Sequence, residues 1–445
     1  MGYQALNDRL TALLSQFDLN QSAGGCSLVI FHGGKLITAL AHGTANIDKH
    51  THDPIPWSSD TLSLNFSTGK GVLVTLVHVL VSNQRLAYDT PIAHYWQQFA
   101  QNGKNTITLR DILTHESGLF NIVSITEHAK DMLDWETMLA RVEKMPANQD
   151  PNTPNKDYSV SKKNAAYSAL VSGWVLGGLI EKATQMPLQQ ALEHYLLAPL
   201  GLVGQAYFGV PTSRVTAVAS QLRKKETHSK PVLTQDTPDT LRFYQSLPFY
   251  HEWQAQTHYP AALTTQAINE LYFQPSQINM EDYKSALVPI GSRQFNYYHP
   301  ATLQAKIPAA NGVASAFALA RIYAMLANQG RWQDTAIISA PIFAELSKIH
   351  NQQFDKIMPA VMAWRLGYHR VFSLCHDVSH AFGHMGYNGS MAWCDPSRDL
   401  ALAFVHNYDV TMLNDTRQFI INETVLDFFK PTTLPPTTSQ PTTPQ

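Results

Sequence analysis

The 445-residue sequence predicts an α/β (α+β) fold, because strand-like segments lie near both ends of the chain and apolar helices fill the middle. One α/β domain with a central antiparallel sheet is expected to combine residues 1–60 with residues 331–430. A helical domain, residues 61–330, would be inserted between them and would carry an aromatic-rich insertion at about residues 222–306. Residues 431–445 contain five Pro and six Thr, which predicts a disordered tail.

The N-terminal elements are predicted to be a helix and a hairpin. Apolar residues recur at helical spacing in the first 20 residues, which indicates an amphipathic helix. Residues 26–31 and 36–41 are typical of strands, and His32-Gly33-Gly34-Lys35 between them favours a tight turn. Asp8 interrupts the apolar character of the first segment, so we expect no signal peptide. The protein is therefore expected to be cytoplasmic.

Later segments supply the remaining elements. Residues 72–81 are apolar nearly all round, which predicts a buried helix. Asn414 is expected to cap a last helix that reaches Phe429. Further helices are predicted at residues 130–145, 165–185 and 314–329, and a second hairpin at residues 390–394 and 400–405.

Composition excludes several functional classes. With 34 acidic and 32 basic side chains the net charge is −2, so no nucleic-acid partner is expected. No apolar run approaches the roughly 18 residues that a membrane span requires. Three cysteines cannot form a disulfide framework and suit a reducing compartment. The oligomeric state is not predicted.

A histidine-rich segment raises the possibility of a metal site. His376, His380 and His384 stand four residues apart, a spacing that would place three ligands on one helix face. Gly383 and Gly386 make a helix there improbable. We therefore predict no metal and no cofactor.

The S-x-x-K motif carries the strongest chemical signal. It occurs at Ser67–Lys70 and again at Ser159–Lys162. Only the first stands at the start of a predicted buried helix, where residues three apart share one face. A lysine half-buried there can lose its proton and activate the serine, whereas a solvated lysine would carry no function. The second motif lies in a polar, Pro-containing segment and is predicted to be accidental.

Five segments occur in the order found in the serine β-lactamase and penicillin-binding-protein superfamily. They are LNFSTGK (residues 64–70), ITLRDILTHESGL (107–119), Tyr167-Ser168, IPAANG (307–312) and GHMGYNGS (383–390). On these segments residues 20–407 resemble the class C-like branch, which includes the family VIII carboxylesterases. The resemblance implies a β-lactamase/transpeptidase-like fold, with an antiparallel sheet flanked by terminal helices and an inserted, mainly helical domain.

The resemblance also implies roles for individual residues. Ser67 would be the nucleophile, Lys70 its activating partner and Tyr167, at the start of a helix, the third polar group. The backbone N–H groups of Ser67 and Tyr387 would form the oxyanion hole. His384 and Gly386 would belong to the strand-edge H-x-G motif at the substrate.

Two departures from the β-lactamase pattern point to an ester substrate. Ala169 stands where β-lactamases have an asparagine, and His384 replaces a lysine that holds the drug's carboxylate. The resemblance therefore favours a serine esterase acting on a small-molecule ester through an acyl-enzyme. An acyltransferase, a β-lactamase, a D-aminopeptidase and an inactive binding homologue remain alternatives. His384 is expected to gain a proton near pH 6.

The aromatic insertion allows two interpretations. Residues 241–300 hold 12 aromatic side chains in 60 residues, and this fraction is twice the 10% found in the whole chain. They could form part of the core, or they could form an apolar lid or acyl pocket. The sequence alone does not separate these two interpretations.

Overall fold

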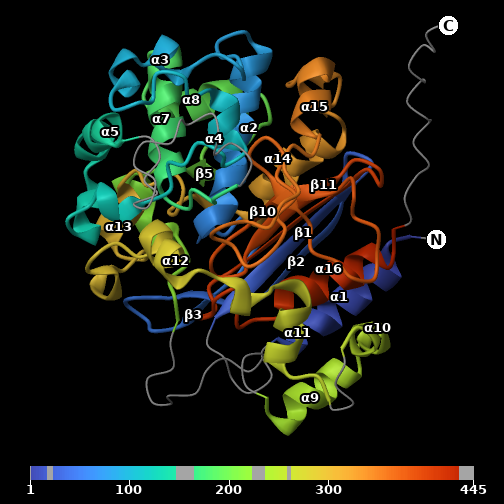
Figure 1. Cartoon of the computed structure of the whole chain (residues 1–445). Helices are drawn as coiled ribbons and strands as arrows, with labels where there is room; N and C mark the ends of the chain where they lie inside the picture. Colours follow the sequence, from blue (N-terminus) through green and yellow to red (C-terminus); the bar gives the residue numbers. More distant parts are fainter. Residues whose placement is uncertain (1, 18–23, 147–164, 223–235, 258–261, 430–445) are drawn as a thin grey trace, which may run out of the picture.

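The computed structural model describes residues 2–17, 24–146, 165–222, 236–257 and 262–429. Within these ranges the chain forms a mixed α/β structure with one large antiparallel sheet and many helices, which confirms the predicted fold class (Figure 1). The predicted tail, residues 431–445, and the second S-x-x-K motif, residues 159–162, lie outside the described residues.

The large sheet joins the two ends of the chain. Its strand order is β3-β2-β1-β12-β11-β10-β9, and β1 pairs antiparallel with β12 so that Cys26 faces His406 and His32 faces Leu400. A smaller sheet has the order β4-β6-β5. The strands are β1 (Gly25–His32), β2 (Lys35–Ile47), β3 (Pro54–Pro56), β4 (Ser63–Leu64), β5 (Ala206–Tyr207), β6 (Val313–Ala314), β7 (Arg331–Trp332), β8 (Thr335–Ala336), β9 (His369–Arg370), β10 (Phe382–Met385), β11 (Met391–Asp395) and β12 (Leu400–His406).

Both predicted hairpins form. In the first, His32 pairs with Lys35, and the two residues between them have positive φ, +56° at Gly33 and +69° at Gly34. A two-residue turn of this kind requires positive φ at both positions, which glycine adopts without a steric penalty. The second hairpin joins β11 to β12.

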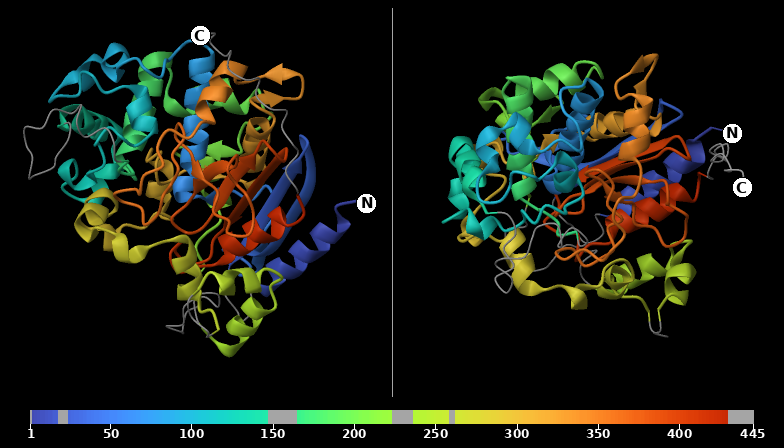
Figure 2. Two further views of the ribbon diagram at one scale, coloured as in Figure 1. Left: turned by 45° about the vertical axis from the view of Figure 1, so that its right-hand side comes forward. Right: turned by 45° about the horizontal axis from the view of Figure 1, so that its top comes forward.

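Helices pack around the sheet, and loops, turns and short 3₁₀ segments connect them (Figure 2). They are α1 (Gln4–Gln16), α2 (Gly69–Ser82), α3 (Ile92–Tyr95), α4 (Leu109–Leu113), α5 (Trp135–Lys144), α7 (Val171–Thr184), α8 (Leu188–Leu192), α9 (Pro238–Gln245), α10 (Tyr250–Ala255), α11 (Thr265–Tyr272), α12 (Met280–Leu287), α13 (Pro300–Gln304), α14 (Ala316–Ala327), α15 (Ala340–Leu346) and α16 (Arg417–Leu426).

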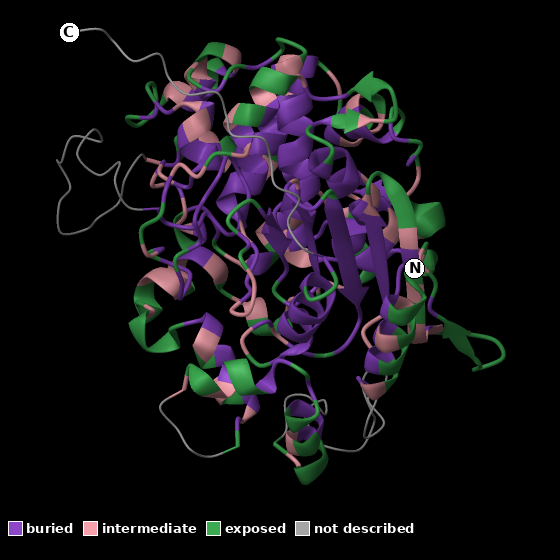
Figure 3. Cartoon of the chain, turned by 90° about the vertical axis from the view of Figure 1, so that its right-hand side faces the viewer, coloured by how far each residue is buried: buried purple, intermediate pink, exposed green. Residues whose placement is uncertain are grey.

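The two faces of the sheet belong to two different cores, because alternate residues of a strand point in opposite directions. Val29 and Ala403 face a core shared with α14 and α2. Leu28 and Leu402 face a second core shared with α1 and α16. The central strands are consequently buried between helices (Figure 3).

Helix α2 is the central helix of the helical region. Residues 72–81 are all buried, as their apolar character predicted, and the helix packs against α7, α14 and α15. The predicted boundary at residue 330 would assign α14 to the helical domain. In the structure α14 packs directly on β1, β11 and β12, so it covers the sheet.

Many aromatic side chains of the insertion serve as core. Tyr244, Trp253 and Tyr272 are buried in the cluster that contains α16. The Tyr272 ring stacks on Phe419 with centroids 3.8 Å apart, and its hydroxyl donates to Glu423 at 2.8 Å. These contacts attach α11 to α16, which shares a core with one face of the sheet. They favour the core interpretation for these residues.

Three predicted helix boundaries were wrong. The segment 130–145 is interrupted at Asp134, whose side chain accepts from the Thr137 N–H and starts α5 afresh. The segment 165–185 becomes helical only at Val171, so Tyr167 does not open the helix. Asn414 does not cap α16, because its side chain accepts from the Thr411 N–H within a turn.

Among the described helices, none has the length and apolar character needed to cross a membrane.

Candidate active site

Ser67 lies in a short 3₁₀ turn, Phe66–Thr68, that leads directly into α2. The turn is fixed on both sides. The Asn65 N–H donates to Gly312 O at 2.9 Å, and the Thr68 hydroxyl donates to Ser390 O at 2.7 Å. These bonds fix the position of the turn that carries Ser67 relative to segments more than 240 residues later in the chain.

Phe66, which precedes Ser67, has a φ of +47°, a conformation that costs a non-glycine residue of the order of 1–3 kcal/mol. Aromatic rings surround its side chain. The ring centroids of Tyr297, Tyr298 and Tyr387 lie 5.4, 6.3 and 5.8 Å from that of Phe66. Two of these residues come from the aromatic insertion, which therefore supports the turn that presents Ser67.

Lys70 occupies the first turn of α2, where the motif spacing predicted it. Its Nζ lies 2.9 Å from Ser67 Oγ and donates to Ala309 O at 2.6 Å. The side chain is only 4% exposed, and burial holds the pKa of the amine well below its usual value. A neutral amine at this position can take the proton of the Ser67 hydroxyl.

The carbonyl of Ala309 belongs to the IPAANG segment, whose role the sequence did not reveal. The Asn311 side chain holds this segment in shape. Its Oδ1 accepts from the Ile307 N–H at 3.0 Å, and its Nδ2 donates to the carbonyls of Thr302 and Ala305, each at 2.7 Å. Ala309 O is thereby presented to Lys70.

The same segment approaches α2 through two glycines. A methyl group added at Gly312 would lie 2.8 Å from the Gly69 Cα, and one added at Gly69 would lie 2.9 Å from the Gly312 Cα. Contacts this short with backbone atoms would force the two segments apart.

We expect Gly312→Ala to separate this segment from α2. Overpacking of this kind costs roughly 1–3 kcal/mol of unfolding free energy, and the shift would also draw Ala309 away from Lys70. Thermal unfolding and kcat should both fall. Gly2→Ala, whose methyl group meets nothing within 4 Å, should change neither, and an unchanged kcat in Gly312→Ala would contradict this role for the close approach.

Tyr167 reaches the site from an irregular segment before α7. Burial raises the pKa of its phenol above the usual value, and a hydrogen bond with Ser67 opposes that shift with a smaller effect. The Lys70 Nζ lies 5.0 Å from the centroid of the Tyr167 ring. The structure thus brings Ser67, Lys70 and Tyr167 together, with the phenol of Tyr167 neutral.

His115 and Trp364 fix the ring of Tyr167. Trp364 stacks on it with centroids 5.5 Å apart and an interplanar angle of 15°, and His115 meets it edge-on at 5.1 Å. The Nδ1 of His115 accepts from the Ser168 N–H at 3.2 Å. His115 belongs to the ITLRDILTHESGL segment, which gives that motif a physical role at the site.

A buried carboxylate holds both Tyr167 and Trp364. Asp355 is 1% exposed, and its oxygens accept from the Tyr167 N–H at 3.2 Å and from Trp364 Nε1 at 2.8 Å. They also accept from the N–H groups of Ile357 and Met358. No sequence pattern marked Asp355 or Trp364, because each lies about 190 residues from Tyr167 along the chain.

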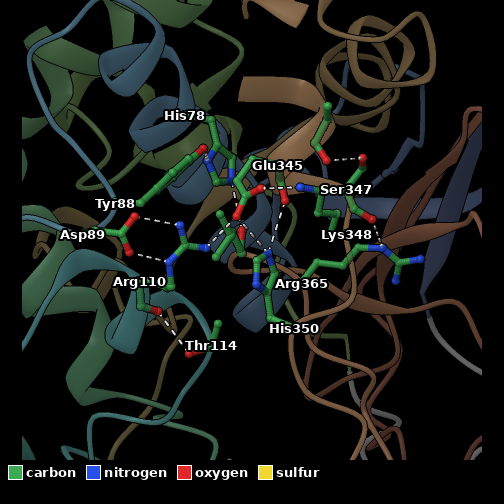
Figure 4. Close-up of polar contacts among 12 residues, drawn as sticks. His78, Tyr88, Asp89, Arg110, Thr114, Glu345, Ser347, Lys348, His350 and Arg365 are labelled. Atoms are coloured by element: carbon green, nitrogen blue, oxygen red, sulfur yellow. Dashed lines mark hydrogen bonds and ion pairs between the residues drawn. The ribbon is translucent and has the colours of Figure 1, made fainter. Parts of the chain in front are cut away.

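Arg110, which belongs to the same ITLRDILTHESGL segment, is the centre of an ion-pair cluster (Figure 4). Arg110 of α4 donates to both oxygens of Asp89, at 2.6 and 2.9 Å, and to Glu345 of α15 at 2.8 Å. The backbone N–H of His350 donates to the carbonyl of Trp364 at 2.8 Å, and the His350 ring contacts Glu345. The cluster therefore joins α4, which belongs to the ITLRDILTHESGL segment, to the segment that carries Trp364.

Strand β10 places His384 at the same site. Its ring centroid lies 6.3 Å from that of Tyr167, its side chain is 3% exposed, and its Nε2 is buried with no hydrogen-bond partner in the structure. Burial, aided by His369 and Lys70, holds the pKa of His384 well below its usual value. The expectation that His384 gains a proton near pH 6 was therefore wrong, because the sequence did not reveal its burial.

The two oxyanion-hole candidates lie on facing segments. A methyl group at Gly386 would lie 2.5 Å from the carbonyl of Asn65, so glycine permits the end of β10 to approach the Ser67 turn. The Gly386 carbonyl accepts from the Gly389 N–H at 2.9 Å. Since a trans peptide directs its C=O and N–H in opposite directions, this bond orients the N–H of Tyr387 as well.

A small pocket with a cavity volume of about 30 Å³, partly open to solvent, lies over Ser67. Besides Ser67, Tyr167 and His384 its lining is mostly apolar. The other lining residues are Leu287, Met358, Met362, Trp364, His369, Met385, Tyr387 and Met412. Leu287 is the one described residue of 241–300 that lines it, so none of the described aromatic side chains of the insertion contributes to this pocket.

Two other sequence predictions concern the histidine-rich segment and Ala169. Within the described ranges no three His, Cys, Asp or Glu side chains gather as metal ligands, although His376, His380 and His384 are all described. Ala169 is buried near Tyr167 and brings only a methyl group to this region.

Comparisons with known proteins identify the family. The sequence model of the Beta-lactamase family matches residues 10–424. The chain is 28% identical over 385 residues to the esterase/beta-lactamase LipL of Mycobacterium tuberculosis, which covers 86% of this chain and 77% of that protein. It is 25% identical over 215 residues to the esterase EstB of Burkholderia gladioli, which covers 44% of this chain and 50% of that protein.

The fold is also found among solved structures. A family VIII carboxylesterase superimposes with a TM-score of 0.70 at 24% identity, over 94% of this chain and 95% of that one. A penicillin-binding protein homologue from Caulobacter crescentus gives a TM-score of 0.64 at 23% identity. Since the family match spans nearly the whole chain and includes the Ser67–Lys70 pair, this protein belongs to the Beta-lactamase family and is a serine hydrolase.

Proposed function

We propose that this serine hydrolase is a carboxylesterase that cleaves uncharged small-molecule esters through an acyl-enzyme on Ser67. The observation that carries the proposal is a buried, electrically neutral site. Lys70 lies 2.9 Å from Ser67 with a lowered pKa, and none of the described residues that line the adjacent pocket is Lys, Arg, Asp or Glu.

In the acylation step the neutral amine of Lys70 takes the proton of the Ser67 hydroxyl. Ser67 Oγ then forms a bond to the ester carbonyl carbon, and the carbonyl electron pair moves to its oxygen. The backbone N–H groups of Ser67 and Tyr387 donate to that oxyanion, and donors of this kind are each worth roughly 10²–10³ in rate. The Ala309 carbonyl keeps the Lys70 amine directed at Ser67.

Collapse of this intermediate breaks the bond between the carbonyl carbon and the ester oxygen. The departing alkoxide takes a proton from Lys70, relayed through the phenol of Tyr167, and leaves as an alcohol. Water then attacks the acyl-enzyme in the reverse sense, gives its proton to the same groups and releases the acid. Tyr167 serves as a proton relay because burial keeps its phenol protonated.

The site is poorly suited to a β-lactam. That substrate has a carboxylate and a side-chain amide, which need a cation and a hydrogen-bond partner. His384 is neutral and Ala169 offers only a methyl group. Each lost charge-assisted bond costs roughly 1.5–3 kcal/mol, about one to two decades in rate. The names of the relatives, one an esterase/beta-lactamase and one an esterase, support the assignment to esters.

We expect kcat/KM for a short-chain p-nitrophenyl ester to exceed that for nitrocefin by orders of magnitude. Both substrates use Ser67 and the same oxyanion donors, so the difference reports recognition of the carboxylate and the amide. Because His384 stays neutral in mild acid, lowering the pH to 6 should not improve KM for nitrocefin.

His384→Lys supplies the matched comparison for this measurement. The new cation should raise nitrocefin turnover relative to ester turnover. Equal kcat/KM for nitrocefin and the ester in the unmodified protein would show that it is a β-lactamase instead.

A further inference from the structure

Methionine is concentrated in the pocket over Ser67. Four of the 11 residues that line it are methionines, whereas the whole chain has 12 methionines in 445 residues. The four side chains are between 2% and 7% exposed. They are Met358, Met362, Met385 and Met412.

The backbone that carries these methionines is held firmly. The Met358 N–H donates to Asp355 at 2.9 Å, and the Met412 N–H donates to Tyr387 O at 2.7 Å. The Met385 N–H donates to Nε2 of His369 at 2.9 Å. The carbonyl of Met362 accepts from the Arg370 N–H at 2.9 Å. The pocket therefore combines a fixed frame with side chains that each have three rotatable bonds.

Methionine side chains fill irregular space and adapt to the shape of a ligand. A lining of this composition attracts apolar groups without imposing one shape. A wall of aromatic or β-branched residues would impose one. The cavity volume is only about 30 Å³, so an alkyl chain can enter when the methionine side chains move aside, which their rotatable bonds permit. Apart from Ser67 and Tyr167, its polar contribution comes from the neutral His369 and His384 and from the half-exposed Tyr387.

We propose that Met358, Met362, Met385 and Met412 form the subsite that binds the unbranched alkyl chain of an ester and sets its preferred length. This inference rests on the proposed esterase function and adds the residues that select the substrate. The alkyl chain could belong to the acyl group or to the alcohol, and the two sources present the same chemistry to the methionines.

The test uses the purified full-length protein and two series of esters. One series is p-nitrophenyl esters with acyl chains of two to twelve carbons, and the other is acetate esters of alcohols of the same lengths. The readout is the ratio of kcat/KM for an eight-carbon chain to that for a four-carbon chain. A ratio is independent of the fraction of protein that is folded.

Met412→Ala should enlarge the pocket and raise this ratio at least about tenfold in one of the two series, since one methylene in an apolar pocket is worth 10–200-fold. The series that responds identifies the acyl or the alcohol chain as the occupant. Met412→Leu, which restores most of the lost volume, should return the ratio toward the original value. Met280→Ala, at a side chain 53% exposed on α12, is the matched control and should leave the ratio unchanged.

Met358→Ala provides an independent variant if Met412→Ala does not fold. An unchanged ratio in both series, with ester hydrolysis retained, would overturn the methionine subsite and leave the esterase function in place. Absence of ester hydrolysis in the unmodified protein would instead overturn the proposed function on which this inference rests.

Discussion

Lys70→Met is expected to lower kcat for ester hydrolysis by roughly 10²–10⁴-fold while the fold is kept. Methionine preserves most of the lysine's length but cannot accept the proton of Ser67, which lies 2.9 Å from Nζ. Removing a buried amine also removes its desolvation cost, so the melting temperature should not fall greatly.

Lys70→Arg separates a base from a simple cation at this position. A guanidinium does not lose its proton in proteins, so this variant should be about as inactive as Lys70→Met. Tyr167→Phe should also lower kcat, and its effect should not add fully to that of Lys70→Met, because residues that act as a unit give non-additive losses. Near-normal turnover in Lys70→Met would rule out the proposed base.

The second large effect concerns stability in acid. Burial lowers the pKa of His78 to about 3, of His115 to about 3 and of His369 to about 4. In the unfolded chain each has a pKa near 6.5. As the pH falls below 6.5 the unfolded chain binds protons that the folded chain cannot, so the free energy of unfolding decreases.

The decrease continues until the pH reaches the folded-state values, and above pH 6.5 these groups have no effect. Each histidine contributes about 1.4 kcal/mol per pH unit, hence about 2 kcal/mol at pH 5. Three of them remove about 6 kcal/mol, a large part of a typical total of 5–15 kcal/mol. His384 and His406, whose pKa values burial also lowers, act in the same direction.

Urea unfolding at pH 7 and pH 5 measures this loss directly. Calorimetry in buffers of different ionisation enthalpy should find at least about three protons taken up on unfolding at pH 5. His78→Gln, which removes one of these groups, should reduce the loss between pH 7 and pH 5 by about 2 kcal/mol. A free energy of unfolding that is the same at both pH values would contradict the assignment of these histidines as neutral.

The sequence was informative wherever a local pattern carried the signal. The apolar residues 72–81 predicted a buried helix, and the spacing of Ser67 and Lys70 predicted that their side chains meet. Tight turns were also local, as Gly33 and Gly34 illustrate. The order of motifs along the chain then led to the correct family.

Features that depend on contacts between distant segments could not be predicted. The carbonyl that holds Lys70 lies 239 residues away, at Ala309, and a backbone carbonyl leaves no mark on the sequence. Asp355 reaches Tyr167 across 188 residues. The pocket methionines come from three separate segments and resemble ordinary core residues one by one.

Errors in the prediction have physical causes of the same kind. The segment from Ala165 to Gln185 is rich in Leu, Val and Ala, and such a composition does not distinguish a buried irregular stretch from a helix. Tyr167 was therefore placed at a helix start that lies instead at Val171. The protonation of His384 was misjudged because its pKa depends on burial and on the neighbouring His369 and Lys70.

The central claim is that Ser67 is the nucleophile of an esterase, and covalent labelling tests it most directly. The protein would be treated with a fluorophosphonate, and the adduct would be placed by intact-mass spectrometry and peptide mapping. We predict one adduct, on the peptide that contains Ser67, and none in Ser67→Ala. An adduct on Ser159 or Ser390, or labelling that persists in Ser67→Ala, would contradict the account.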